Sequence, residues 1–207
     1  MTGEEARADR LVSELSHELH TPLALIVGYA ELLQIRTDEV TRRDAPTRIL
    51  EAAERLAAAM DTLLVVLALD AGWLSVEPTP VNLETALAGL SPAVDGSAFV
   101  LVDEEHLGRI LQTLLAIGPG PADVRIAERA GVASIAILNA GIELSEAQLE
   151  QFFDRAAPAG LPVRSVLDAY IARMLVELHG GAISAEAVAG KGLRIVFTLP
   201  LAPEASR

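Results

Sequence analysis

The chain has 207 residues, of which 51% are hydrophobic and 22% are charged. This composition supplies a buried core and excludes an intrinsically disordered protein. The net charge of −13 argues against a nucleic-acid surface, because contacts to phosphates require clustered lysine and arginine. The absence of cysteine excludes disulfide bonds and thiolate metal sites, and the four histidines are not spaced as zinc ligands. The sequence therefore predicts a globular protein without a metal of its own.

Apolar runs in the chain are short. The longest, residues 62–69, ends at Asp70, whereas a helix that crosses a bilayer needs ~20 apolar residues. The N-terminus is acidic and polar, unlike a signal peptide. These features predict a cytoplasmic location with no membrane span and, if the chain is complete, no sensor domain of its own.

The first predicted helix runs from about Glu4 to Ile35, with apolar residues at spacings of three, four and seven. Within it, residues 13–23 read SELSHELHTPL. Pro22 removes an amide donor and clashes with the carbonyl of Glu18, a kink that a helix needed only for packing would not require. A histidine, an adjacent carboxylate and a hydroxyl one turn later accompany the proline. This combination suggests a nucleophilic imidazole on the surface of the helix.

A polar turn over Thr37–Asp44 separates the first helix from a second one, which continues to about Asp70. Pro46 is expected in the first turn of this second helix, where its missing amide costs little. Two helices joined by a short turn form an antiparallel hairpin, whose apolar stripe stays exposed in a single copy. Pairing with a second copy would bury the stripe in a four-helix bundle. We therefore expect a homodimer.

The linker, residues 73–80, is followed over residues 81–207 by helices and antiparallel strands, as in an α+β domain. Asn82 is expected to cap a short helix, and Gly180-Gly181 to stop the last helix. Residues 190–192 lack the spacing of a phosphate loop and indicate a hairpin turn. The predicted helices span residues 83–90, 104–117, 146–153 and 166–178, and the predicted strands span residues 98–102, 123–128, 132–138, 182–187 and 193–199.

The segment SHELHTPL around His17 resembles the H-box of bacterial two-component sensor histidine kinases, although His20 stands where that family usually has arginine. The segment HGGAISAEAVAGKGLRIVFTLP, residues 179–200, resembles the closing segment of their ATPase domain. The resemblance covers nearly the whole chain. It implies a dimerisation and phosphoacceptor domain over residues 1–72 and a degenerate ATPase-like α/β sandwich over residues 81–207.

The resemblance also implies roles for the H-box residues. His17 would be the phosphoacceptor, and histidine suits this role because its pKa of ~6.5 leaves a neutral, nucleophilic nitrogen near pH 7. Glu18 is expected to accept a hydrogen bond from one ring nitrogen of His17, although adjacent helix residues do not face the same way. Thr21 lies one turn after His17 and would orient a water that dephosphorylates a partner. Pro22 is expected to be structural.

Nucleotide binding in that family depends on three boxes, and each departs from the family pattern here. In the first box, DEEHLGRILQTLLAIG, the asparagine that would bind magnesium falls on Ile117, which offers no oxygen ligand. In the second box, NAGIELSEAQLEQFF, the aspartate that would accept a hydrogen bond from adenine is Asn139. Gly141 is retained in that box. The next glycine is replaced by Glu143, which adds bulk and negative charge near the expected phosphates.

In the third box, two glycines of the family pattern fall on Val166 and Asp168. Glycines there would let backbone amides approach a triphosphate at a helix start, which a β-branched side chain and an anion both oppose. The loop over residues 155–165 is also short for a nucleotide lid. We therefore expect no cofactor: ATP and magnesium binding are predicted to be lost, and a partner receiver would bring its own magnesium.

The sequence thus predicts a histidine phosphotransferase of a two-component phosphorelay, which shuttles phosphate between His17 and an aspartate of response-regulator receiver domains without ATP. The second domain would dock receivers, and a cognate histidine kinase is a further candidate partner. Two alternatives stay open. One is a non-catalytic pseudokinase that binds and modulates a kinase or regulator, with His17 unused. The other is an ATP-dependent sensor histidine kinase with an atypical nucleotide site.

Overall fold

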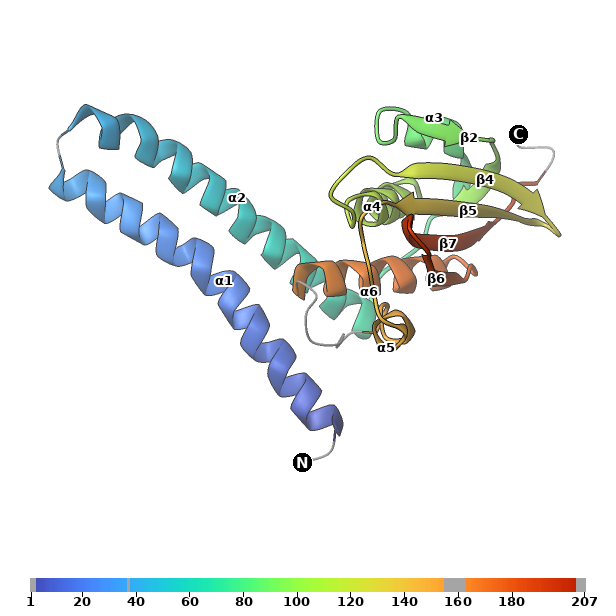
Figure 1. Ribbon diagram of the computed structural model, residues 1–207, viewed down its shortest axis with the longest axis horizontal. Coiled ribbons are helices and arrows are strands. Elements are labelled where there is room, and N and C mark those ends of the chain that lie inside the picture. The colour runs from blue at the N-terminus through green and yellow to red at the C-terminus, as the bar shows by residue number, and fades with distance from the viewer. Residues whose placement is uncertain (1–2, 37, 155–162, 204–207) are drawn as a thin grey trace. The chain divides into compact units, whose positions relative to one another are not determined.

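The computed structural model describes residues 3–36, 38–154 and 163–203. The chain divides into two compact units, Met1–Gly72 and Trp73–Arg207 (Figure 1). Each unit has its own secondary structure: the first is a pair of long helices, and the second combines helices with β-strands. No described helix is long and apolar enough to cross a bilayer.

The first unit is the predicted antiparallel hairpin, formed by α1 (Gly3–Ile35) and α2 (Glu39–Asp70). The second helix begins earlier than expected, because the Asp38 carboxylate accepts a hydrogen bond from the Thr41 amide at 2.9 Å and caps the helix at that point. The turn predicted over Thr37–Asp44 is therefore wrong from Glu39 onward, and Thr37 lies outside the described residues. Pro46 consequently lies inside α2 and not in its first turn.

The second unit contains a five-stranded sheet in the order β2-β4-β5-β7-β6 and a two-stranded sheet of β1 and β3. The pairing of β2 with β4 is parallel, and every other pairing is antiparallel. The strands are β1 (Thr79–Asn82), β2 (Ala93–Asp95), β3 (Phe99–Val102), β4 (Asp123–Arg129), β5 (Val132–Asn139), β6 (Ile183–Val188) and β7 (Gly192–Pro200). The helices are α3 (Leu83–Leu87), α4 (Glu104–Leu115), α5 (Glu146–Glu150) and α6 (Val163–Leu178).

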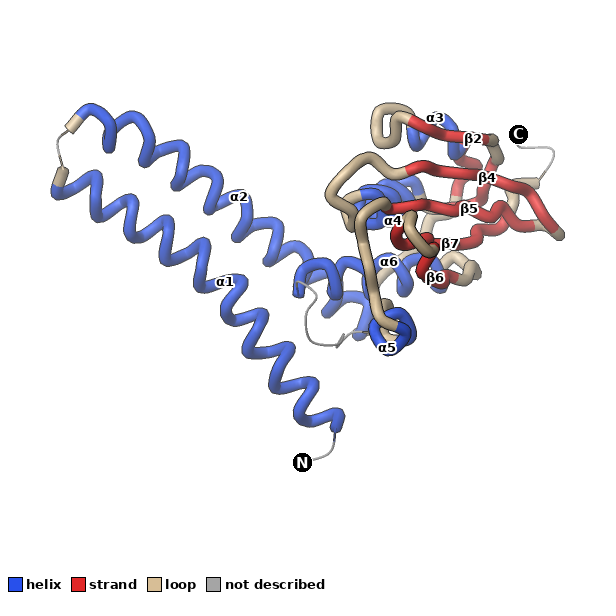
Figure 2. The backbone as a smooth tube through the Cα atoms, viewed as in Figure 1, coloured by secondary structure: helices blue, strands red, loops and turns tan. Residues whose placement is uncertain are grey.

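The core of the second unit lies between the large sheet and the two longer helices, α4 and α6 (Figure 2). Every second residue of β5 and β7 is buried on the helix side, as expected for strands with one covered face. The intervening residues of β5, which include Ser134 and Ala136, lie on the other face and are partly exposed. The fully buried residues include Ile135, Ile137, Phe197, Leu111, Leu114, Ile171 and Leu175.

The α+β class, the hairpin and the α/β sandwich are confirmed, but two short strands were missed. β1 takes up the last two residues of the predicted linker, Thr79 and Pro80, and β2 lies inside a segment predicted to be irregular. A proline in a strand is tolerated when the strand lies at a sheet edge, as β1 does. The partners of β1 and β2 are distant in the sequence, so local residue patterns do not indicate the pairing.

Candidate functional site

The H-box lies on α1, where His17 and Thr21 are both exposed and lie one turn apart. The Thr21 hydroxyl donates a hydrogen bond to the His17 carbonyl at 2.8 Å. The same hydroxyl oxygen lies 3.5 Å from Nδ1 of the His17 ring. Pro22 is buried inside the hairpin and has no amide hydrogen, so the Glu18 carbonyl loses its partner in the helix. The sequence therefore places the imidazole at a locally weakened turn of the helix.

The contact with Thr21 bears on which ring nitrogen of His17 carries the proton. Because the one hydroxyl hydrogen of Thr21 is used on the backbone carbonyl, a bond to the ring requires Nδ1 to donate. A separation of 3.5 Å makes this bond weak, but it favours the tautomer with the proton on Nδ1. Nε2 then keeps its lone pair and bonds to no described residue. A ring nitrogen with a free lone pair, on an exposed side chain, is suited to act as a nucleophile.

The side chains of the other H-box residues form fewer hydrogen bonds than those of His17 and Thr21. Glu18 and His20 are exposed, and the predicted hydrogen bond between Glu18 and the His17 ring is not formed. The reason is geometric, since adjacent helix residues point in different directions. The catalytic role of Glu18 stays a prediction.

In the second unit, Asn139 lies at the end of β5 and its side chain is fully buried. Its Nδ2 donates a hydrogen bond to the Leu114 carbonyl at the end of α4, at 3.2 Å. Its Oδ1 has no partner among the described residues. Gly118 packs directly over this amide: a Cβ atom on Gly118 would lie 3.2 Å from Oδ1. The turn after α4 therefore covers the atom that would face an adenine ring.

The neighbouring box positions offer little to a nucleotide. Ile117, half-buried in that turn, carries only carbon and cannot ligate Mg²⁺. Gly141 has a φ of +77° and makes a left-handed turn, and Glu143 is exposed two residues further on. Within the described part of the chain, no group of three histidine or acidic side chains is placed to hold a metal ion.

Val166 and Asp168 do not lie in a loop before a helix. Both belong to α6, which begins at Val163, three residues earlier than predicted. Only the first four amides of a helix lack an internal partner, so the amide of Asp168, the sixth helical residue, is occupied within the helix. The side chain of Val166 and the lid positions 155–162 lie outside the described residues. The family's glycine positions are thus part of a regular helix here.

A partly buried cluster at the start of α4, which the sequence did not reveal, joins distant parts of the second unit. His179, at the end of α6, accepts a hydrogen bond from the Asp103 amide at Nε2, at 3.1 Å. Its Nδ1 lies 2.7 Å from the Leu175 carbonyl and donates to it. These two bonds fix a neutral tautomer with the proton on Nδ1. His179 is therefore a structural residue that ties α6 to α4.

His106 packs edge-on against His179, with ring centroids 5.4 Å apart. Burial lowers the pKa of His106, and the nearby Asp103 carboxylate opposes this effect. Asp103 caps α4 by accepting hydrogen bonds from the amides of Glu105 and His106, and it also accepts one from the amide of Glu77. Burial works against its charge, but these amides together hold the pKa of Asp103 below its usual value. The cluster therefore anchors both the linker and α4.

Each of the two units matches a known domain family. Residues 7–72 match the His Kinase A (phospho-acceptor) domain, and residues 102–203 match the histidine kinase-, DNA gyrase B- and HSP90-like ATPase domain. The chain is 30% identical over 225 residues to the sensor protein DivL of Caulobacter vibrioides, with 94% of this chain and 29% of DivL aligned. It is 26% identical to the sensor protein kinase PmrB of Pseudomonas aeruginosa, with 96% of this chain and 47% of PmrB aligned. The chain thus spans less than half the length of these relatives.

Two solved structures share the fold across most of the chain. The histidine kinase AdeS of Acinetobacter baumannii superposes with a TM-score of 0.68 at 15% identity, covering 90% of this chain and 98% of AdeS. Full-length ShkA, solved in complex with AMPPNP, superposes with a TM-score of 0.67 at 21% identity, covering 94% of this chain and 46% of ShkA. At these identities the likeness concerns the fold alone.

Proposed function

The chain belongs to the two-component sensor histidine kinase family, and we propose that it acts as a histidine phosphotransferase of a phosphorelay. The observation that carries the proposal is the exposed His17 side chain, whose Nδ1 lies 3.5 Å from the Thr21 hydroxyl oxygen. The lone pair of Nε2 would attack the phosphorus of a receiver's aspartyl phosphate. A P–N bond forms, the P–O bond breaks, and its electron pair stays on the aspartate as a carboxylate. The reverse step would load a second receiver.

The state of the second unit supports a phosphate source other than ATP. Asn139 is used as a packing residue between β5 and α4, and Gly118 lies over its free oxygen. Ile117 cannot take the place of a magnesium ligand, and Asp168 brings a carboxylate into the helix where the family has glycine. A receiver would supply its own magnesium, so this chain would need to contribute only the imidazole and a surface on which the receiver docks.

The surface of the hairpin supports dimerisation. Large apolar side chains on both helices are 41–60% exposed in the single chain, which is costly for a lone hairpin in water. A second copy would cover them in a four-helix bundle, with one His17 from each chain near its surface. These side chains are Leu23, Leu25, Val27, Leu50, Met60, Leu64 and Leu67.

The proposal is tested by incubating the protein with a receiver domain that carries labelled aspartyl phosphate. We expect acid-labile, base-stable label on the wild-type chain and none on His17→Ala. His20→Ala is the matched control, because it removes another exposed histidine from the same helix and should keep the label. Absence of label on the wild type, or equal labelling of His17→Ala, would overturn the proposal and favour a pseudokinase that leaves His17 unused.

A working kinase is the second candidate, and one observation favours it. The buried Oδ1 of Asn139 lacks a partner, and the amino group of adenine would supply one if the turn over it moved away. Calorimetric titration with Mg-ATP separates the two candidates. Micromolar binding, followed by label on His17 from ATP, would replace the phosphotransferase proposal with an atypical kinase. We expect no binding heat.

A further inference from the structure

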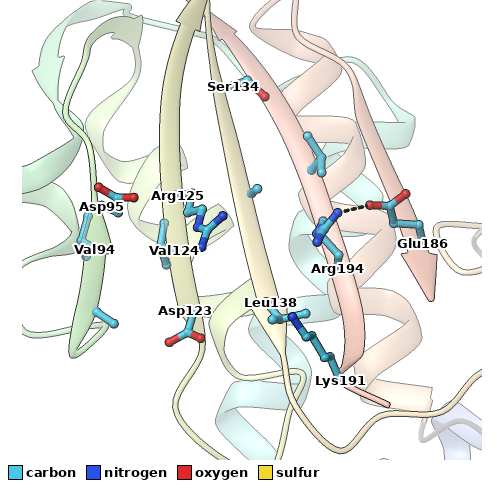
Figure 3. Close-up of a pocket in the computed structure, with 13 residues that line it drawn as sticks. Val94, Asp95, Asp123, Val124, Arg125, Ser134, Leu138, Glu186, Lys191 and Arg194 are labelled. Carbon is cyan, nitrogen blue, oxygen red and sulfur yellow. Dashed lines mark hydrogen bonds and ion pairs between the residues drawn. The ribbon is translucent and has the colours of Figure 1, made fainter. Parts of the chain in front are cut away.

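A hollow of about 590 Å³ lies on the open face of the five-stranded sheet, opposite α4 and α6 (Figure 3). We propose that this hollow, which we call the sheet-face pocket, binds a small zwitterion with an aliphatic body, such as a free amino acid or a short peptide. The pocket is separate from the box residues around Asn139, because Asn139 is buried on the helix side of β5. The inference does not depend on the proposed phosphotransfer.

The shape of the pocket follows from the strand register. Ala136, in the middle of β5, pairs with Arg125 on β4 and with Val196 on β7. Leu138 similarly pairs with Asp123 and with Arg194. Neighbouring strands are about 4.8 Å apart, so a methyl side chain between longer neighbours leaves a depression. The floor is therefore short and apolar, while the rim is built from long charged side chains.

Charges of both signs stand around this floor. The rim carries three cations, Arg125, Lys191 and Arg194, and three carboxylates, Asp95, Asp123 and Glu186. One pair is satisfied internally, since Arg194 contacts Glu186 at 2.8 Å. Figure 3 shows Arg125 leaning toward β5, with Asp95 on its other side. Among the described residues neither Arg125 nor Lys191 forms an ion pair, so two cations and two carboxylates remain available.

This balance selects the ligand chemistry. The whole chain carries a net charge of −13, which repels a simple anion at long range, whereas a zwitterion meets no such repulsion. Its carboxylate would bind Arg125 or Lys191, and its ammonium group Asp95 or Asp123, through charge-assisted hydrogen bonds. Its aliphatic part would cover Ala136 and the apolar side chains beside it. The volume suits this class, because small-molecule pockets are about 300–1,000 Å³.

The test follows the alanine methyl signals of the intact chain by NMR while L-leucine or the dipeptide Leu-Leu is added. We expect the Ala136 methyl to shift with a Kd of about 1 mM or below, and the tighter of the two probes identifies the source as amino acid or peptide. N-acetyl-leucine and leucinamide each lack one charge and should bind at least about tenfold more weakly. Equal binding of N-acetyl-leucine would overturn the zwitterion assignment, and no shift with any probe would overturn the site.

Variants localise the effect, with calorimetry as the readout. Arg125→Gln should weaken binding about tenfold or more. Arg129→Gln is its matched control, because Arg129 lies on the same face of β4 but outside the pocket, and it should bind as wild type does. Ala136→Leu should fill the floor and abolish binding while the thermal unfolding midpoint holds, since the position lies on the open face. Unchanged binding in both pocket variants would refute the proposal.

Discussion

In the hairpin, the motif residues His17 and Thr21 are exposed and bond mainly to their own turn of helix. In the second unit, the residue at the adenine-binding position, Asn139, is fully buried and bonds across to the end of α4. The side chains of the first motif are thus accessible to a partner, whereas the side chain of Asn139 packs inside its unit. The difference teaches that residues at a family's motif positions can also support the fold, as the hydrogen bond from Asn139 to the Leu114 carbonyl does. Four substitutions or conditions probe the contrast.

Restoring the family's residue at position 139 should give the largest effect. In Asn139→Asp, a buried carboxylate would face the Leu114 carbonyl, which would lose its donor. We expect the free energy of unfolding to fall by about 3 kcal/mol, because an unpaired buried charge is costly. Urea denaturation measures the change. Asn82→Asp is the matched control: Asn82 caps α3, where aspartate serves equally well, so stability should hold. Micromolar Mg-ATP binding by Asn139→Asp would instead show that the nucleotide site survives.

The buried His179 and the exposed His17 give a second comparison, in which each histidine is replaced by alanine. His179→Ala removes both buried hydrogen bonds, to the Asp103 amide and the Leu175 carbonyl, and should destabilise the protein by about 2 kcal/mol. His17→Ala removes an exposed ring and should change the free energy of unfolding by less than about 0.5 kcal/mol. Equal effects in urea denaturation would contradict the assignment of His179 as a structural residue and of His17 as an exposed one.

The sequence predicted most of the fold because its signals are local. The alternation in β5 and β7, the Asn82 cap and the stop at Gly180 each lie within a few residues of the structure they specify. The contact of His17 with Thr21 was also foreseeable from the spacing of four on a helix.

The remaining features depend on residues far apart in the sequence. The bond from the Asp103 amide to His179 spans 76 residues, and β2 pairs with a strand beyond α4. The alternation of β5 places Asn139 on the buried face, but the packing of Gly118 against its side chain joins residues that are 21 positions apart. The buried face of β5 could therefore be predicted, but the packing of Gly118 over the Asn139 oxygen could not.

A smaller effect is expected at Thr21. Thr21→Val keeps the β-branched shape but removes the oxygen that accepts from Nδ1 of His17, so the ring loses its preferred tautomer. We expect the rate of phosphate transfer to His17 to fall about tenfold, which corresponds to about 1.4 kcal/mol. The rate is measured by quench-flow with a labelled phospho-receiver, and Thr21→Ser should recover most of it in this assay. A Thr21→Val rate equal to wild type would show that the threonine does not orient the ring.

The smallest expected effect is a pH dependence carried by His106. Burial lowers the pKa of His106 in the folded protein below the value of about 6.5 in the unfolded chain. The unfolded state therefore takes up the proton first as pH falls, so this contribution to stability is complete above pH ~6.5 and is lost below it. Asp103 and Glu105 pull the pKa the other way, while His179 and Arg109 act with burial, and the ring is only partly buried. The loss should thus stay below about 1 kcal/mol.

The substitution His106→Leu tests this assignment. Leucine removes the titrating ring together with Nδ1, which is buried without a partner among the described residues. Replacing an unsatisfied polar atom by an apolar one should leave the stability at pH 7 unchanged or raised by about 1 kcal/mol. The free energy of unfolding, measured by urea denaturation from pH 7.5 to pH 5, should then fall less steeply than in the wild type. If both profiles had the same slope, the acid sensitivity would belong to groups outside this cluster, and His106 would be a packing residue alone.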